Sequence, residues 1–333
     1  MATIYEVSKL AGVSLATVSR VMNNSSRVSP KTRQKVLAAM QKLDYHPNTI
    51  AQSLASKRSN SVGVLVSELH GPIFGSLVSG IEEELTRAGK FSIFAVGHSD
   101  GEKEKDGINF LISRNCDALI FHLEASSDEF LLAQKNSALP FVIVNRLVSG
   151  LEENCISLNN VKGGIEATRF LLKQGHRDIA YISGPLHWGD AGQRLAGHKT
   201  ALAEFGIPFD PNIMVEGDYL VQSGYVAMKQ LFGRKAKFTA VICANDEMAV
   251  GAMDAIREQG LSMPEDISLV GFDNVRWAPF LSPKLTTVNN PVNEMGRMAA
   301  RWVLKNVYGI NDRPIQTFFE PEIVVRESAG ARV

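Results

Sequence analysis

The feature that most constrains the fold is a regular alternation of short apolar runs with amphipathic helical patterns. The apolar runs lie at 62–67, 91–97, 117–122, 141–145, 178–184, 240–246 and 268–273. The helical patterns lie near 74–89, 102–114, 161–175, 193–206, 222–232, 247–260 and 292–307. This repetition predicts an α/β body with a parallel sheet covered by helices. Because the strands read as continuous apolar runs, we expect both faces to be buried.

Polar side chains follow several of these strands directly, namely Ser67, Asn145, Arg146, Asn245, Asp246 and Asp273. Ligand sites in open α/β sheets form at the carboxyl ends of strands. Arg194 is expected to begin the helix after the strand that ends at Gly184, and Phe74, Trp188 and Tyr219 could cover the apolar face of a sugar. Each residue alone is more typical of a strand-end cap or a core position, but their shared placement on successive strands favours a site for sugar hydroxyls.

The first 24 residues predict two short helices joined by a tight turn. Residues 4–11 carry an apolar stripe at helical spacing, and Gly12 can adopt the left-handed conformation that ends a helix. Ser14 is a good N-cap for a second helix, 15–23, which buries Val18, Val21 and Met22. This is the helix-turn-helix pattern, in which the second helix presents its start to the DNA major groove.

A third helix is expected after Ser29 and Pro30, with Val36, Met40 and Leu43 along its buried face. Residues 49–56 then form a hinge segment too short to be stable as an isolated helix. The alternative for this head is a three-helix bundle that mediates protein contacts.

The overall net charge of zero hides an asymmetry. Residues 1–60 carry nine basic and two acidic side chains, a net charge of +7. The other 273 residues carry 26 basic and 33 acidic side chains, a net charge of −7. A basic head on an acidic body favours a polyanionic partner for the head alone, although a solvated basic surface would have the same composition.

Several function classes lack their sequence signals. There is no 18-residue apolar stretch and no signal-peptide pattern, so we expect a cytoplasmic protein without a membrane anchor. Cys116, Cys155 and Cys243 are widely spaced and read as reduced core residues, and no paired metal-ligand motif is present. We find no nucleophile elbow, phosphate loop or complete dinucleotide fingerprint, so we expect no enzyme, no cofactor and no metal.

The motifs together resemble the lactose/galactose repressor family from residue 2 to about 328. The resemblance is carried by VSKLAGVSLATVSRVMN, NTIAQSLASK, GHRDIAYISGP, RLAGHKTAL, ANDEMAVGAM, PEDISLVGFDN and LSPKLTTV. Leu15-Ala16 and the stretch from GHSDGEKEK to CDALIFH resemble the galactose repressor branch more than the lactose or purine branches.

The resemblance implies a helix-turn-helix head at 1–46, a hinge helix and linker at 47–60, and a two-lobed body at 61–333 that binds the effector and forms the dimer. The body is expected to be of the periplasmic-binding-protein type, with doubly wound parallel sheets. Lobe 1 would span about 61–160 and 291–318, and lobe 2 about 161–290 and 319–330. The effector residues implied are Phe74, Asn145, Trp188, Arg194, Tyr219, Asn245, Asp273 and Asn290. Trp188 stands where a purine-binding relative has an arginine contact, which argues against a purine.

The resemblance also implies a DNA-binding set in the head and hinge, with Leu54 as a minor-groove wedge. Its members are Ser14, Leu15, Ala16, Thr17, Ser19, Arg20, Asn23, Arg27, Ser29, Thr32, Asn48, Ala51, Leu54 and Ala55. The expected partners are a double-stranded DNA operator, a small sugar effector such as galactose or a galactoside, and a second copy of the chain. Another sugar, a corepressor ligand, or a sugar-binding protein without a regulatory role remain the alternatives.

Overall fold

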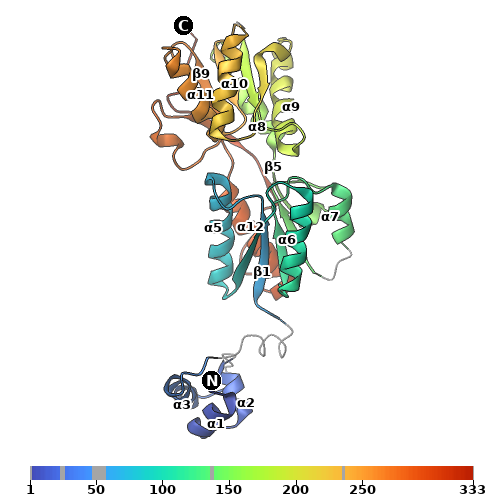
Figure 1. Ribbon diagram of the computed structural model, residues 1–333, viewed down its shortest axis with the longest axis vertical. Helices are drawn as coiled ribbons and strands as arrows, with labels where there is room; N and C mark the ends of the chain where they lie inside the picture. Colours follow the sequence, from blue (N-terminus) through green and yellow to red (C-terminus); the bar gives the residue numbers. More distant parts are fainter. Residues whose placement is uncertain (1, 23–26, 47–57, 136–138, 235–236, 333) are drawn as a thin grey trace. The chain divides into compact units, whose positions relative to one another are not determined.

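A computed structural model describes residues 2–22, 27–46, 58–135, 139–234 and 237–332 (Figure 1). The chain divides into two compact units, Met1–Asn60 and Ser61–Val333, and each is described by itself. Within the described residues no helix is long and apolar enough to cross a membrane.

The N-terminal unit holds three helices, α1 (Ile4–Ala11), α2 (Leu15–Met22) and α3 (Pro30–Lys42). Thr3 and Glu6 form a reciprocal capping box at α1, and Gly12 ends this helix in the left-handed conformation with φ of 65°. The hydroxyl of Ser14 accepts a hydrogen bond from the Thr17 amide at 3.2 Å, and Ser29 caps α3 in the same way. The two predicted N-caps are therefore confirmed.

Five buried side chains form the core of this unit: Val7, Val18, Val21, Val36 and Ala39. Met22, Met40 and Leu43, which we predicted as buried, pack around that core and are only partly covered. Ala39, rather than a larger side chain, is buried on α3 beside Val36.

The second unit contains two six-stranded sheets rather than one continuous sheet. The first has the order β11-β5-β4-β3-β1-β2 and the second β12-β10-β9-β8-β6-β7. The strands are β1 (Ser61–Val66), β2 (Phe91–Val96), β3 (Ala118–Phe121), β4 (Phe141–Val144), β5 (Cys155–Leu158), β6 (Ile179–Ser183), β7 (Met214–Glu216), β8 (Ala240–Cys243), β9 (Ser268–Asp273), β10 (Thr286–Asn289), β11 (Phe318–Phe319) and β12 (Glu322–Val324). All pairs are parallel except β10 with β12, so the predicted parallel sheets are confirmed, with one antiparallel pair at the edge of the second sheet.

Eight helices of the second unit are described (Figure 1). They are α5 (Pro72–Arg87), α6 (Gly101–Ser113), α7 (Asp128–Gln134), α8 (Asn160–Lys173), α9 (Gly189–Glu204), α10 (Val221–Gly233), α11 (Asp246–Glu258) and α12 (Val292–Tyr308). Helix α7 was not predicted from the sequence. The predicted start of α9 is wrong, because this helix begins at Gly189 rather than near Arg194. Gly189 and Gly192 weaken the helical pattern of the first turn, so the apolar periodicity of α9 is clear in the sequence only after Gly192.

Three helix pairs pack through glycines that face each other. A Cβ on Gly80 of α5 would lie 2.1 Å from the Asn293 carbonyl oxygen on α12. The same close approach joins α8 to α9 through Gly164 and Gly197, and α10 to α11 through Gly224 and Gly251. Because the backbones of the two helices are in contact at these crossings, the helices of each pair pack very closely.

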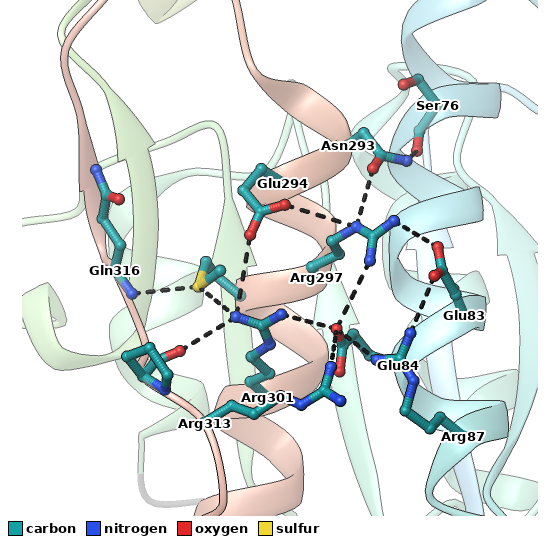
Figure 2. Close-up of polar contacts among 12 residues, drawn as sticks. Ser76, Glu83, Glu84, Arg87, Asn293, Glu294, Arg297, Arg301, Arg313 and Gln316 are labelled. Atoms are coloured by element: carbon teal, nitrogen blue, oxygen red, sulfur yellow. Dashed lines mark hydrogen bonds and ion pairs between the residues drawn. The ribbon is translucent and has the colours of Figure 1, made fainter.

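A polar network also joins α5 to α12 (Figure 2). Glu84 on α5 is only 3% exposed, and one of its carboxylate oxygens lies near four arginines. Arg301 and Arg87 are nearest, at 2.8 and 2.9 Å, and Arg313 and Arg297 follow at 3.3 and 3.8 Å. Arg313 lies between α12 and β11, so this carboxylate also fixes the segment that leads into β11.

Candidate effector pocket and DNA-binding head

The eight effector residues predicted from the sequence line a single pocket of the second unit. Strand ends, loops and helix starts of both sheets contribute to it. The predicted members are Phe74, Asn145, Trp188, Arg194, Tyr219, Asn245, Asp273 and Asn290. These eight residues, which the family resemblance implied, are up to 216 positions apart in the chain.

Arg194 is buried and held rigidly at the base of this pocket. Its Nε donates to the Asn160 side-chain oxygen at 2.9 Å, and its Nη1 donates to the Ala244 carbonyl at 2.6 Å. The guanidinium stacks over the Phe272 ring at 3.8 Å from the ring centre. Burial alone would lower its pKa, but Tyr219, Asp190 and Asp273 outweigh that effect and raise the pKa of Arg194. The side chain is a fixed cation with a planar set of donors.

Asp273 ends β9 with a strained backbone, since its φ is 113°. Its carboxylate accepts a hydrogen bond from the side-chain NH₂ of Asn290 at 3.1 Å and lies 3.8 Å from Nη1 of Arg194. Burial raises the pKa of Asp273 to about 6, although Arg194 and Asn290 act in the opposite direction. At neutral pH the group is therefore an ionised acceptor, well suited to a pair of sugar hydroxyls.

An aromatic wall closes one side of the pocket. Trp188 and Tyr219 stack with ring centres 5.7 Å apart, and the Tyr219 hydroxyl donates to Asp190 at 3.1 Å. Gly184 leaves room for this arrangement, because a Cβ there would lie 2.2 Å from the Tyr219 ring. From the other sheet, Phe74 packs edge-on against His122 at 5.2 Å.

Both side-chain groups of Asn245 already make hydrogen bonds within the protein. Its side-chain oxygen caps α11 by accepting from the Met248 amide at 2.9 Å, and its NH₂ donates to the Tyr219 carbonyl at 2.8 Å. The side chain therefore holds Tyr219 in the left-handed conformation, with φ of 72°, and keeps only part of its hydrogen-bonding capacity for a ligand.

Two of the polar strand-end residues point elsewhere. Asp246 is fully buried and binds the Thr287 hydroxyl at 2.6 Å and the Val275 amide at 2.9 Å. Arg146 donates to the Ser126 carbonyl at 2.7 Å and pairs with Asp128, in a hollow that adjoins the pocket.

The pocket also contains residues that sequence reasoning did not select for it. They are Glu68, His70, Gly71, Ile73, Ser99, His122, Glu124, Asp190, Asp218, Leu220 and Glu247, and Ser67, which the strand-end rule did select, lines the pocket with them. His122 directly follows β3, so the strand-end rule would have found it had it been applied to that strand. Asp190 lies in the glycine-rich start of α9, where the sequence carries no comparable signal.

Four buried polar atoms in this pocket have no hydrogen-bond partner among the residues that the structure describes. They are Ser67 Oγ, His122 Nδ1, Asn145 Oδ1 and Asn290 Oδ1. Buried polar groups are normally paired, so atoms left over around one pocket are typical of a site for a polar ligand.

The head presents the start of α2 to solvent. Ser14, Ala16 and Arg20 are exposed, and Leu15, Thr17 and Ser19 are partly covered. Arg27 and Ser29 are exposed, and Thr32 is partly covered. The hydroxyls of Ser14 and Ser29 are also engaged as caps, so they fix the helices from which any DNA contact is made. Asn23, Asn48, Ala51, Leu54 and Ala55 lie outside the described residues.

All three cysteines are buried and none forms a disulfide, as the sequence predicted. Within the described part of the chain, no three His, Cys, Asp or Glu side chains come together as metal ligands.

Two family models match the chain. Residues 3–48 match the lacI family of bacterial regulatory proteins, and residues 168–329 match the periplasmic binding protein-like domain. The chain is 39% identical to the HTH-type transcriptional regulator GalR of Escherichia coli strain K12, over 99% of this chain and 96% of that protein. It is 37% identical to GalS of Salmonella typhimurium strain LT2, over 100% and 98% of the two chains.

Among solved structures, the lac repressor dimer bound to operator and the anti-inducer ONPF matches with a TM-score of 0.88 and 31% identity, over 99% of each chain. These matches confirm the family and the galactose repressor branch that the motifs indicated. The chain belongs to the LacI family of helix-turn-helix transcriptional regulators.

Proposed function

We propose that this regulator is a repressor that binds a pseudo-palindromic operator as a homodimer and is released by a small sugar, galactose or a galactoside. The observation that carries the sugar is the pocket itself. A buried arginine, an ionised aspartate, a stacked aromatic pair and four unpaired polar atoms surround one space. Planar hydrogen-bonding groups beside aromatic faces are the chemistry that recognises a sugar ring.

The homodimer and the operator rest on the family and on geometry. A helix-turn-helix protein reads a two-fold symmetric site with two copies of its recognition helix. One solved structure that matches over 99% of each chain is described as the lac repressor dimer bound to operator. A DNA-binding role also favours a cytoplasmic location and a regulator rather than an enzyme.

The effector must act through a difference in affinity between two states. A sugar that bound the DNA-competent and DNA-incompetent arrangements equally well would shift nothing. We place the change between lobe 1 (about 61–160 and 291–318) and lobe 2 (about 161–290 and 319–330), because the pocket is lined from both. A coupling of about 1–3 kcal/mol is typical for such a switch.

The test is fluorescence anisotropy of a galactose-type operator at fixed salt, titrated with protein and then with sugars. Salt is held constant because phosphate contacts make affinity strongly dependent on it. Tight binding released by galactose supports the proposal. Tight binding that ignores galactose would retain the regulator and replace the effector, and binding no tighter than to random DNA would overturn the operator assignment.

A further inference from the structure

We propose that Glu124 selects the charge of the effector and that the pocket binds a sugar carrying a cationic amine more tightly than its neutral counterpart, while rejecting anionic sugars. This inference rests on the proposed sugar effector and names its chemical class more narrowly. It is argued from the charge balance of the pocket and from the surroundings of one carboxylate.

The pocket lining is strongly acidic. It contains a single arginine, Arg194, and six carboxylates: Glu68, Glu124, Asp190, Asp218, Glu247 and Asp273. A phosphorylated sugar or a uronic acid would bring a further negative charge into this space. In a partly desolvated pocket like charges repel strongly, so an anionic effector is disfavoured.

Most of these carboxylates already have a partner. Glu68 pairs with His70 at 2.9 Å, and Asp218 accepts from the Leu220 amide at 2.9 Å. Asp190 accepts from Tyr219, and Asp273 accepts from Asn290. Glu247 is partly exposed, and nearby His70 opposes the effect of burial on its pKa.

Glu124 differs because its side chain is only 15% exposed and none of the described residues donates a close hydrogen bond to its carboxylate. The nearest donor candidate is His122 Nδ1 at 3.5 Å, and burial lowers the pKa of this histidine so that it is neutral. The neighbouring arginines are engaged elsewhere, Arg146 with Ser126 and Asp128 and Arg194 with Asn160 and Ala244.

The backbone holds Glu124 in this place. Buried Glu104 accepts hydrogen bonds from the amides of Glu124, Ala125 and Ser126, at 3.0, 3.1 and 2.7 Å, and from the Ser126 hydroxyl at 2.6 Å. These four bonds pin the loop after β3. The backbone of Glu124 is therefore held at the edge of the pocket.

A buried carboxylate without donors either takes up a proton or binds a cation. Burial, with Asp190 and Glu104 adding to it, raises the pKa of Glu124 well above its usual range. A ligand ammonium would supply both charge and hydrogen bonds, and Glu124 would then release its proton. The hydroxyls of a neutral sugar offer only neutral hydrogen bonds to the same group.

The test is isothermal titration calorimetry of the full chain with D-galactose, D-galactosamine and D-galacturonate at about pH 7, where most of the amine is protonated. We expect galactosamine to bind roughly tenfold more tightly than galactose, as a charge-assisted hydrogen bond allows. Galacturonate should not bind detectably. Repeating the galactosamine titration in buffers of different ionisation enthalpy should reveal proton release that galactose does not cause.

In Glu124→Gln the advantage of galactosamine over galactose should disappear, and urea unfolding compared with wild type checks that the variant is folded. Glu102→Gln is the matched control, because Glu102 is 84% exposed on α6 and lies outside the pocket. If galactose binds and galactosamine binds no better, or if Glu124→Gln retains the preference, the charge selection is wrong and the proposed function stands. If operator binds but none of the three sugars does, both proposals fail.

Discussion

At the scale of single residues, the pocket gathers side chains held by unusual backbone conformations. Asn145, Tyr219 and Asp273 have φ of 64°, 72° and 113°. Such conformations cost on the order of 1–3 kcal/mol for residues other than glycine and tend to occur at functional sites. Here they turn three side chains from the ends of loops and strands toward one space, so local strain is part of how the site is built.

We expect Asp273→Asn to stabilise the protein at neutral pH and to abolish its response to sugar. The raised pKa of Asp273 means that the folded state holds its proton above the pH at which the unfolded chain loses it. Stability from this group is therefore present in acid and is lost as pH rises from about 4 to about 6. By pH 7 the cost approaches roughly 3 kcal/mol, and asparagine would not incur it.

Urea unfolding of wild type and Asp273→Asn at pH 4 and pH 7 measures this effect as a difference between the two proteins. The variant should gain stability relative to wild type on going to pH 7, and it should still bind operator without responding to sugar. A pH-independent difference would contradict the buried ionised state. Normal release of the variant by sugar would contradict the assigned role.

At the scale of elements, helix pairs crossing at glycines decide how precisely the pocket is positioned. Gly164 and Gly197 allow α8 to lie directly against α9, the helix that carries Arg194. The distance between α8 and α9 at this crossing therefore sets the position of the Arg194 guanidinium. Overpacked contacts in protein interiors are destabilising because neighbouring backbone cannot yield cheaply.

We predict that Gly164→Ala destabilises the protein by about 3 kcal/mol, since its Cβ would lie 2.1 Å from the Arg194 carbonyl oxygen. The sugar affinity should fall with it, because α9 must move. Gly233→Ala is the control, as nothing lies within 4 Å of its Cβ, and it should change stability by less than about 1 kcal/mol. Chemical denaturation curves compare the two variants, and equal stability would rule out a tight crossing.

The carboxylate at the junction of α5 and α12 should be equally sensitive (Figure 2). Burial opposes ionisation of Glu84, but hydrogen bonds from Arg301 and Arg87 overcome this and lower its pKa. Glu84→Ala would leave several arginines without their buried partner, and we expect a loss of about 3–5 kcal/mol. The loss should shrink as pH falls and the wild-type carboxyl becomes protonated.

Glu82→Ala on the same helix is the comparison, because Glu82 is exposed and bonds only to Thr86. Thermal or urea unfolding at neutral and acidic pH provides the measurement. If both alanine variants unfold alike, the network contributes no more than an ordinary surface pair.

At the scale of the whole molecule, the basic head and the acidic body are expected to divide two tasks. We propose that the head contacts the DNA, and that the pocket of the second unit binds the sugar. The residues expected to link the two events, 47–57, lie outside the described residues, so this part of the account comes from the sequence.

We predict that Leu54→Ala weakens operator binding by at least about tenfold and leaves sugar affinity unchanged, because an apolar wedge bends DNA without touching the pocket. Leu37→Ala is the control, since Leu37 is an exposed leucine on α3 outside the expected DNA-binding set. Anisotropy measures the first effect and calorimetry the second. Unchanged operator affinity in Leu54→Ala would eliminate the wedge.

Local interactions made much of this protein readable from its sequence. Capping by Ser14 and Ser29, the left-handed Gly12, and the strand and helix periodicities depend on residues a few positions apart, so they were predicted correctly. The strand-end rule also selected Ser67, Asn145, Asn245 and Asp273, which line the pocket, because parallel strands bring their carboxyl ends to one edge. The full set of eight effector residues was implied by the family resemblance.

Tertiary structure alone decided the rest. Strands β5, β7, β10, β11 and β12 are two to four residues long, and β11 pairs with β5 some 160 positions away, so no local pattern marks them. The division into two sheets, the acidic balance of the pocket and the isolation of Glu124 follow from loops that meet only in the folded chain. The periodicity of the sequence shows which face of each helix or strand is buried. The charges around a site depend on which elements become neighbours in the folded chain, and periodicity does not show this.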